Sequence, residues 1–400
     1  MTQTRPPLWR DLRVLRIAGQ VAAVVLVVLT VRWLIGNLTS NLGAQGIDTG
    51  FDVLNQPTNF SVRDDPGFDS RSSLWPNLIL VGVRNTAIAA FVGIAMAMVL
   101  GTLIGVGRLS ENWLVAKLSQ VYVEVFRNIP PLVIIVFFGF AVFTFGPLPI
   151  FNPRNPPWQY RLPWSDDVFL ILSNDRWGIP SFATDGDTGI FWLVALVGLV
   201  AAAAVWCWRT RVNAATGAPH HRVVFSLATL LAVTAAGFVA LGGPYRVSWP
   251  AVSESGRIIE GGFSTNAGYL SVTLALGLYT ASHVAEIIRG SILAVHRGQS
   301  EAANALALSG FQRYRFVVLP QAMRIAIPPI INQFLNLTKN TSLGVAVAYP
   351  EITSLIKTAI GNGKPAVQLL VVLMAVYLSF SLVFSLLLNL VNRRFQLVGR

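Results

Sequence analysis

Charged side chains are scarce in this 400-residue sequence. Asp, Glu, Lys and Arg together make up 12% of it, whereas soluble domains carry roughly 25%. Hydrophobic residues make up 54%. A chain with so little charge and so much apolar surface is suited to lipid rather than to water. Cys207 is the only cysteine, which excludes a disulfide bond within the chain.

Motifs for nucleotide, metal or covalent chemistry are also missing. The sequence has no G-x-x-x-x-G-K-[ST], HExxH, CxxC or GxSxG pattern. The segment Gly361-Asn-Gly363-Lys364-Pro365 lacks the upstream glycine and the hydroxyl residue of a phosphate-binding loop. His220 and His221 are adjacent, so they point in different directions on a helix and predict a basic loop. We expect no catalytic residue, no metal site and no cofactor bound by this chain.

Long apolar runs are what the sequence has instead. A helix needs about 20 apolar residues to cross the hydrocarbon core of a bilayer. Eight runs meet this length, and they are predicted at 17–38, 78–106, 121–145, 190–208, 223–242, 267–288, 325–347 and 366–391. The fold class is therefore an all-α integral membrane protein with about eight transmembrane helices.

The charges between these runs predict the orientation of the chain. With the N-terminus inside, the segments 1–16, 107–119, 209–222, 289–324 and 392–400 are cytoplasmic and hold 17 Lys and Arg. The outside segments 39–77, 146–189 and 243–266 hold 7. This bias places both termini in the cytoplasm. The net charge of +12 is scattered between the spans, so it predicts membrane orientation rather than nucleic-acid binding.

Polar groups within the spans mark two candidate sites. Glu124 and Arg127, and likewise Glu286 and Arg289, are spaced i,i+3 and are expected to pair near the cytoplasmic edge, as a gate or as an anchoring ion-pair network. A second set offers amide, hydroxyl and ammonium groups for the two charges of an amino acid: Asn332, Gln333, Asn336, Lys339 and Ser342. The alternative for this set is that it joins the seventh span to its neighbours.

Proline pairs open two of the polar spans. Pro130-Pro131 opens the third, and Pro328-Pro329 opens the seventh. Because proline fits the first turn of a helix and disrupts its interior, a helix start or a break is expected at both places.

The segment between the sixth and seventh spans contains a short helix of small residues. We expect Gly298 to end the preceding helix, Ser300 to cap the next, and Glu301 to lie in its first turn. Gly310 is expected to end that helix, and Pro320 the following one. Alanines then give the helix almost no side-chain bulk, which permits close approach of another protein.

This segment resembles the EAA loop of ABC importer permeases. The residues that carry the likeness are Gly298, Glu301, Ala302, Ala303, Ala307, Leu319 and Pro320. The usual pattern has glycine where Ala307 stands. Flanking segments resemble the polar-amino-acid importers: Tyr122–Leu132, Ala285–Gly290, Leu319–Ala322 and Leu337–Leu343. The extra N-terminal span and the long insertion resemble the general L-amino-acid permease subgroup.

The resemblance implies one subunit of a heteromeric importer. Such a chain forms half of the translocation pore, beside a homologous second permease, and its EAA loop couples to an ABC ATPase dimer that uses ATP–Mg. An extracytoplasmic binding protein delivers polar or general L-amino acids. The implied location is the inner (plasma) membrane.

The resemblance also implies a division of the chain. Residues 1–77 would form the N-terminal region, 78–145 and 267–392 the type I permease core, 146–266 an insertion with two extra spans, and 393–400 a cytoplasmic tail.

Two other functions were weighed. A self-sufficient secondary transporter predicts an inverted repeat and acidic residues at mid-membrane depth, and neither is evident beyond the proline pairs. A membrane-embedded hydrolase needs a nucleophile or a metal constellation, which the sequence lacks. The residues do not name the amino acid that is carried, nor which permease subunit binds it.

Overall fold

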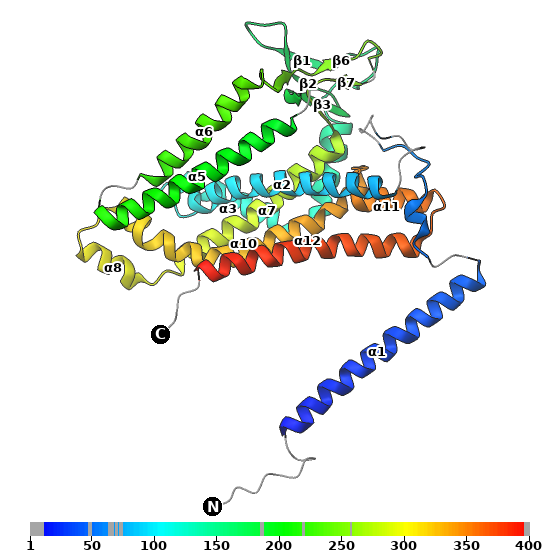
Figure 1. The fold of residues 1–400 in the computed structure, drawn as a ribbon, viewed down its shortest axis with the longest axis horizontal. Coiled ribbons are helices and arrows are strands. Elements are labelled where there is room, and N and C mark those ends of the chain that lie inside the picture. Colours follow the sequence, from blue (N-terminus) through cyan, green and yellow to red (C-terminus); the bar gives the residue numbers. More distant parts are fainter. Residues whose placement is uncertain are drawn as a thin grey trace, which may run out of the picture. The chain divides into compact units, whose positions relative to one another are not determined.

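The computed structural model describes residues 12–46, 50–62, 68, 71, 75–184, 188–217, 221–256 and 258–395. Long helices dominate them (Figure 1). These are α1 (Leu12–Ala44), α2 (Trp75–Gly107), α3 (Trp113–Asn128), α5 (Gly189–Thr216), α6 (Arg222–Ala240), α7 (Ala267–Leu293), α10 (Leu319–Asn340) and α12 (Ala366–Phe395). The short helical elements are η1 (Asp52–Asn55), α4 (Pro131–Val136), η2 (Phe137–Thr144), α8 (Arg297–Ala305), α9 (Gly310–Arg313), η3 (Tyr314–Val318), η4 (Thr341–Val347) and α11 (Ile352–Gly361).

The expected membrane fold is confirmed. Among the described residues, six helices are long and apolar enough to cross a membrane, and the number rises to eight if two interrupted helix pairs each count as one span. The predicted cytoplasmic ends include residues 1–11 and 396–400, which lie outside the described residues.

The third predicted span, 121–145, is not one straight helix. It lies in two segments, Trp113–Asn128 and Pro131–Thr144, with a bend of 102° between them. Ile129 and Pro130 are extended at this break, with ψ of 128° and 139°. A proline restricts the residue before it to extended conformations, which explains the bend.

The second proline pair does not break its helix. Pro328 and Pro329 lie inside α10, and the helical path runs without a break from Gly310 to Val347. The helix start or break expected at Pro328-Pro329 is therefore wrong. The fixed φ of proline is compatible with a helix. The energetic cost of a proline inside a helix comes from the backbone hydrogen bond that it cannot donate.

Short strands fill the two predicted outside loops at 146–189 and 243–266. They are β1 (Trp158–Arg161), β2 (Val168–Leu172), β3 (Arg176–Ile179), β4 (Ser181–Thr184), β5 (Tyr245–Ser248), β6 (Ala251–Val252), β7 (Ile259–Glu260) and β8 (Phe263–Asn266). The order β1-β2-β3-β8 forms an antiparallel sheet, and β4-β5 and β6-β7 form two further pairs.

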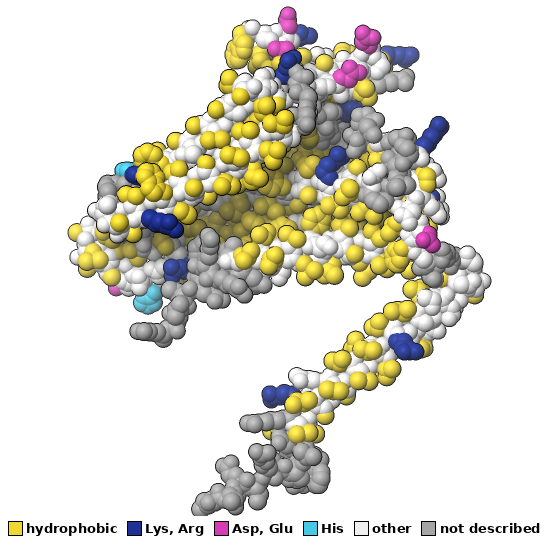
Figure 2. Space-filling view, in the orientation of Figure 1, with side chains coloured by type: hydrophobic (Ala, Val, Ile, Leu, Met, Phe, Trp, Pro, Cys, Tyr) yellow, Lys and Arg dark blue, Asp and Glu magenta, His cyan; other side chains and the backbone are white. Residues whose placement is uncertain are grey.

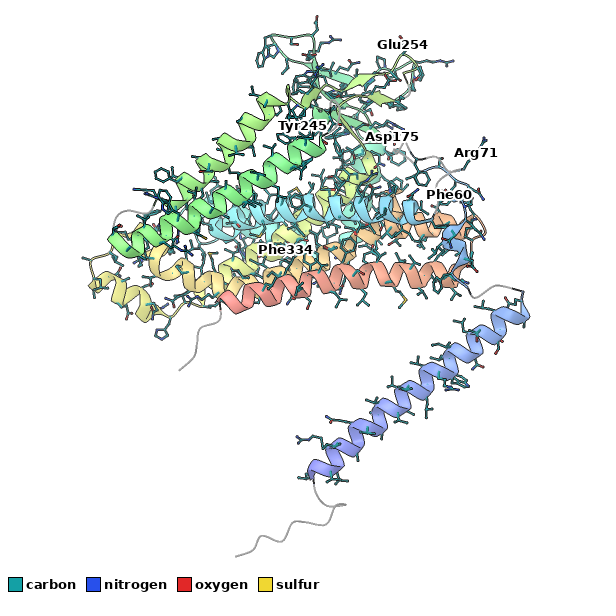
Figure 3. The ribbon with its side chains drawn as sticks, in the orientation of Figure 1. Phe60, Arg71, Asp175, Tyr245, Glu254 and Phe334 are labelled. Carbon is teal, nitrogen blue, oxygen red and sulfur yellow. The ribbon has the colours of Figure 1, made fainter. Side chains whose placement is uncertain are left out.

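The sheet fixes the start of α7. Asn266, the last residue of β8, caps the helix, because its Oδ1 accepts a hydrogen bond from Tyr269 N at 2.7 Å. Ala267 N donates to the carbonyl of Asp175, in the turn between β2 and β3, at 2.8 Å (Figure 3). The strands therefore lie at the opposite end of this 27-residue helix from α8, about 40 Å away.

The chain divides into two compact units, and α2 contributes to both. One unit comprises residues 1–86 and 350–391. Its apolar core joins the beginning of α2 to α11 and α12 through side chains such as Trp75, Ile352, Ile356 and Leu369. The helix α1, in the same unit, exposes hydrophobic side chains along its length, as a helix in lipid would.

Glu351 is fully buried in this unit. Its carboxylate caps α11, because Oε2 accepts from Thr353 N at 2.8 Å and Oε1 from Ser354 N at 2.7 Å. Tyr377 of α12 donates its hydroxyl proton to the same group at 3.2 Å. The acid is therefore held by three hydrogen bonds, which is how buried carboxylates are tolerated.

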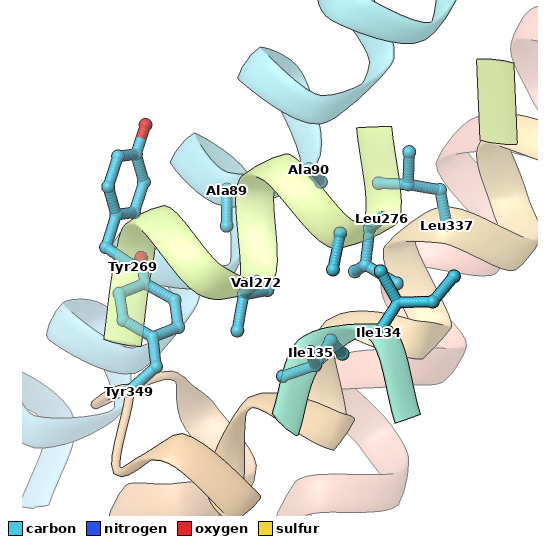
Figure 4. Close-up of a cluster of buried hydrophobic side chains, with 10 residues drawn as sticks. Ala89, Ala90, Ile134, Ile135, Tyr269, Val272, Leu276, Leu337 and Tyr349 are labelled. Carbon is cyan, nitrogen blue, oxygen red and sulfur yellow. The ribbon is translucent and has the colours of Figure 1, made fainter. Parts of the chain in front are cut away.

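The other unit comprises residues 87–349 and 392–400 and is built around α7. Its core holds side chains from α2, α4, α7 and α10, among them Ala89, Ile135, Val272 and Leu337 (Figure 4). Tyr269 and Tyr349 pack together at one end of this cluster, with ring centroids 5.6 Å apart. The helices α5 and α6 form a separate hairpin and pack closely against each other (Figure 1).

Two glycines on one face of α2 allow it to approach α7. A Cβ at Gly101 would lie 2.7 Å from Cβ of Val284 and 2.9 Å from the carbonyl oxygen of Ala281. A Cβ at Gly105 would lie 2.8 Å from the carbonyl oxygen of Ala285. Glycines four residues apart are a common device for close packing of membrane helices, where apolar transfer provides no driving force.

This contact yields a first prediction. Replacing Gly101 by alanine should lower the free energy of unfolding by about 1–3 kcal/mol, because the added methyl group overlaps Val284 and α7 backbone. Thermal unfolding of the purified assembly measures the effect. The control is Gly290→Ala in α7, where a Cβ meets nothing within 4 Å. Equal unfolding temperatures for the two variants would contradict the packing argument.

Candidate functional site

The predicted coupling segment forms a short helix, α8. Only one of its nine residues is buried. Ala303 is 2% exposed and faces the protein, whereas Glu301, Ala302 and Ala305 face outward. The expectation of a helix with little side-chain bulk is therefore met. Larger apolar side chains flank it, since Leu306 and Phe311 are also exposed.

Several predicted boundaries of this segment are wrong. The cap of α8 is His296, whose Nδ1 accepts a hydrogen bond from Gly298 N at 3.1 Å. Gly298 and Ser300 lie within the helix. Gly310 begins α9, because Ser309 and Gln312 form a reciprocal cap there.

The predicted end at Pro320 is wrong for a related reason. Leu319 and Pro320 are the first two residues of α10, and the π-helix η3 directly precedes them, so the helical path continues through Pro320. Both Gly310 and Pro320 were expected to end a helix. Instead, Gly310 is the first residue of α9 and Pro320 is the second residue of α10.

Ala307 adopts a backbone conformation that glycine favours. Its φ is +55°. Leu308 N donates to the carbonyl of Ala303 at 3.1 Å, and Ala307 N donates to that of Asn304 at 2.9 Å. These two bonds define a Schellman motif, the usual end of a helix with a left-handed residue. Alanine in this conformation is strained by roughly 1 kcal/mol relative to glycine.

Two side-chain hydrogen bonds fix α8 to the helices that follow. Gln321 Nε2 of α10 donates to Gln299 Oε1 at 3.1 Å. Arg313 Nη1 of α9 donates to Asn304 Oδ1 at 3.0 Å. Only residues 294–296 separate α8 from α7. The helix α8 is therefore connected to α7 by three residues and to α9 and α10 by side-chain hydrogen bonds.

A cluster of charges lies on α7 two turns before this connection. Glu286 pairs with Arg289 on the same helix, at 2.6 Å between Oε1 and Nη2, as the spacing predicted. It also pairs with Arg108, which follows α2, and its Oε2 lies 3.9 Å from Nη1 of Arg127 on α3. One carboxylate thus holds three guanidinium groups from three parts of the unit.

Glu124 does not take part as expected. Its Oε1 accepts from Gln120 Nε2 at 2.6 Å, and among the described side chains no ion pair joins it to Arg127. Glu124, Arg127, His283 and Glu286 line a cleft of about 380 Å³ together with Arg108. Sequence reasoning missed Arg108 as a partner, since its only signal was a basic residue directly after an apolar run.

The predicted substrate residues form an exposed polar face on α10. Asn332, Asn336 and Lys339 are exposed and recur at intervals of four and three residues, which places them on one side of the helix. These three side chains make no hydrogen bond or ion pair with other described residues. Gln333 and Ser342 are half-buried, and Ser342 Oγ donates to the carbonyl of Lys339 at 2.8 Å. Their role in binding stays a prediction.

Comparison with known families is decisive. The model of the binding-protein-dependent transport system inner membrane component matches residues 93–397. The chain belongs to this family. The resemblance found in the EAA-like segment is thereby confirmed, and the role of this permease is transport rather than enzymatic catalysis.

Three relatives match nearly the whole permease. The general L-amino acid transport system permease protein AapQ of Rhizobium johnstonii is 36% identical over 95% of this chain and 92% of the relative. The putative amino-acid ABC transporter permease protein YhdX of Escherichia coli is 35% identical over 95% and 94%. The glutamate/glutamine/aspartate/asparagine transport system permease protein BztB of Rhodobacter capsulatus is 33% identical over 98% and 96%.

The Schellman motif of the permease gives a second prediction. Ala307→Gly should raise the free energy of unfolding by about 1 kcal/mol, because glycine relieves the strain at φ +55°. Thermal unfolding of the assembled complex measures this change. Ala305→Gly is the matched control, since position 305 lies within α8, where glycine destabilises. A lower unfolding temperature for Ala307→Gly would contradict the strain.

Proposed function

We propose that this chain is a permease subunit of an ATP-driven importer of polar or general L-amino acids. The observation that carries the proposal is the likeness to AapQ, YhdX and BztB over 95–98% of the chain, since all three are named as amino-acid transport permeases. The chain would form half of a pore, and a homologous second permease would form the other half.

In this proposal, α8 docks into an ABC ATPase dimer. Its exposed small residues, Glu301, Ala302 and Ala305, permit close contact with a partner surface. The ATPase would bind and hydrolyse ATP–Mg, and this chain would bind no cofactor. The hydrogen bonds that Gln299 accepts from α10 and Asn304 accepts from α9 would make α8 move as a body with these helices.

Movement of α8 would be transmitted both to the charge cluster around Glu286 on α7 and to the polar face of α10. Glu286 lies seven residues before the end of α7, about 10 Å along the helix. Its three arginine partners come from separate segments, so a shift of α7 would rearrange them. We propose that this cluster, with Glu124 beside it, forms the cytoplasmic gate.

The polar face of α10 would contact the amino acid. Lys339 offers an ammonium group for the substrate carboxylate, and the amides of Asn332, Gln333 and Asn336, with Ser342, offer donors and acceptors. An extracytoplasmic binding protein would deliver the substrate from the side of the strands. The chain would lie in the inner membrane with both termini in the cytoplasm, in keeping with the excess of Lys and Arg in the connections at the α8 end.

The test is ATP-dependent uptake by the complete complex in proteoliposomes, with a panel of radiolabelled amino acids. The third prediction concerns the double variant Asn332→Leu, Asn336→Leu. Its KM should rise roughly 5- to 30-fold, because each lost hydrogen bond is worth about 1 kcal/mol. ATP hydrolysis without substrate should stay unchanged.

Asn213→Leu in α5 is the matched control, since it makes the same change in a helix outside the proposed path. An unchanged KM in the double variant would refute the substrate role of α10. Uptake that proceeds without any ATPase would refute the proposed function itself.

A further inference from the structure

Arginines and aromatic rings are stacked across one end of the α5–α6 hairpin. The guanidinium carbon of Arg209, on α5, lies 4.5 Å from the ring centroid of Phe225 on α6. The guanidinium carbon of Arg222, on α6, lies 4.7 Å from the ring centroid of Trp206 on α5. Each helix thus supplies one cation and one ring, and the two pairs cross between the helices.

The stacking of Arg222 on Trp206 orients its guanidinium group without using the hydrogen-bonding capacity of that group. A guanidinium over a ring face is held by the quadrupole of the ring, while its N–H groups point outward in its own plane. Arg222 makes no hydrogen bond or ion pair with another described residue. It is therefore prepared to donate to an anion that is not part of the described chain.

The hairpin contains no acidic residue that could balance this charge. The sequence has no Asp or Glu from residue 188 to 253, whereas Arg209, Arg211 and Arg222 lie at this end of the hairpin, with His221 directly before Arg222. The first turn of α6 adds backbone donors, because no described side chain caps it. No acidic side chain of residues 188–253 therefore balances the charge of these arginines.

The position of this end within the membrane identifies the kind of molecule. Both helices are apolar enough to cross a membrane. Their outer faces are covered with hydrophobic side chains, and Lys or Arg side chains lie toward the left-hand end of the hairpin (Figure 2). Trp206 and Trp208 are 40% and 59% exposed there, and tryptophan is enriched at the level of lipid headgroups.

We propose that the end of the hairpin formed by Trp206, Arg209, Arg211, Arg222 and Phe225 binds the phosphate of an anionic phospholipid headgroup. The lipid lies in the leaflet away from β4 and β5, which is the inner leaflet if the termini are cytoplasmic. Basic clusters between membrane helices on that side are suited to anionic headgroups. The proposal depends on the helices crossing the membrane and is independent of the transported substrate.

The fourth prediction follows. Native mass spectrometry of the complete complex, titrated with phosphatidylglycerol or phosphatidylcholine, should show preferential retention of phosphatidylglycerol. The double variant Arg209→Gln, Arg222→Gln should reduce that retention about tenfold. The control is Arg246→Gln, on β5 at the other end of the hairpin, which should leave it unchanged. Size-exclusion chromatography confirms that the variants assemble.

Three results would overturn the proposal. One is equal retention of phosphatidylglycerol and phosphatidylcholine by the unmodified complex, a measurement that requires no variant. Another is an equal loss of phosphatidylglycerol in the Arg246→Gln control. The third is displacement of the lipid by 10 mM inorganic phosphate, which would show that the site binds a free anion instead.

Discussion

Close packing between α2 and α7 is the constraint on which the rest of the structure depends. In lipid, apolar side chains gain nothing by leaving their solvent, so helices associate through backbone approach and polar contacts. Gly101 and Gly105 allow that approach over one turn of each helix. The end of α2 then brings Arg108 to Glu286, and this ion pair of the charge cluster depends on the approach of the two helices.

The coupling segment depends on the same helix. The cap of α8, His296, lies in the short connection after α7. Asn304 and Gln299 of α8 accept hydrogen bonds from side chains of α9 and α10, which connects α8 to those helices. The strands at the other end fix α7 through Asn266 and Asp175. One helix of about 40 Å therefore connects the exposed helix α8 at one end to the strands at the other.

Some of this arrangement could be predicted from the sequence. Apolar length predicted the spans, because lipid requires each crossing segment to satisfy its own backbone hydrogen bonds. The small residues around Ala303 predicted a short helix with almost no side-chain bulk. The i,i+3 spacing also predicted the pair of Glu286 and Arg289.

Other features depend on contacts that no local pattern reveals. Gly310 begins α9 although glycine is more typical of helix ends, and Pro320 lies in the first turn of α10 although proline often follows a helix end. The chain bends by 102° at Pro130-Pro131, whereas Pro328 and Pro329 lie inside a helix, so the dipeptide alone does not decide between a break and a continuous helix. Arg108 and the strand pairings involve partners distant in the sequence.

The central claim is that α8 faces the cytoplasm and holds the ATPase. It is tested by placing a single cysteine at position 301, as Glu301→Cys with Cys207→Ser, in the assembled complex. Our account predicts that a membrane-impermeant maleimide labels this cysteine only in inside-out vesicles. It also predicts that a short bifunctional reagent joins it to the ATPase subunit, with a yield that changes on addition of ATP–Mg. Labelling in intact cells, or an active complex without the cross-link, would contradict the account.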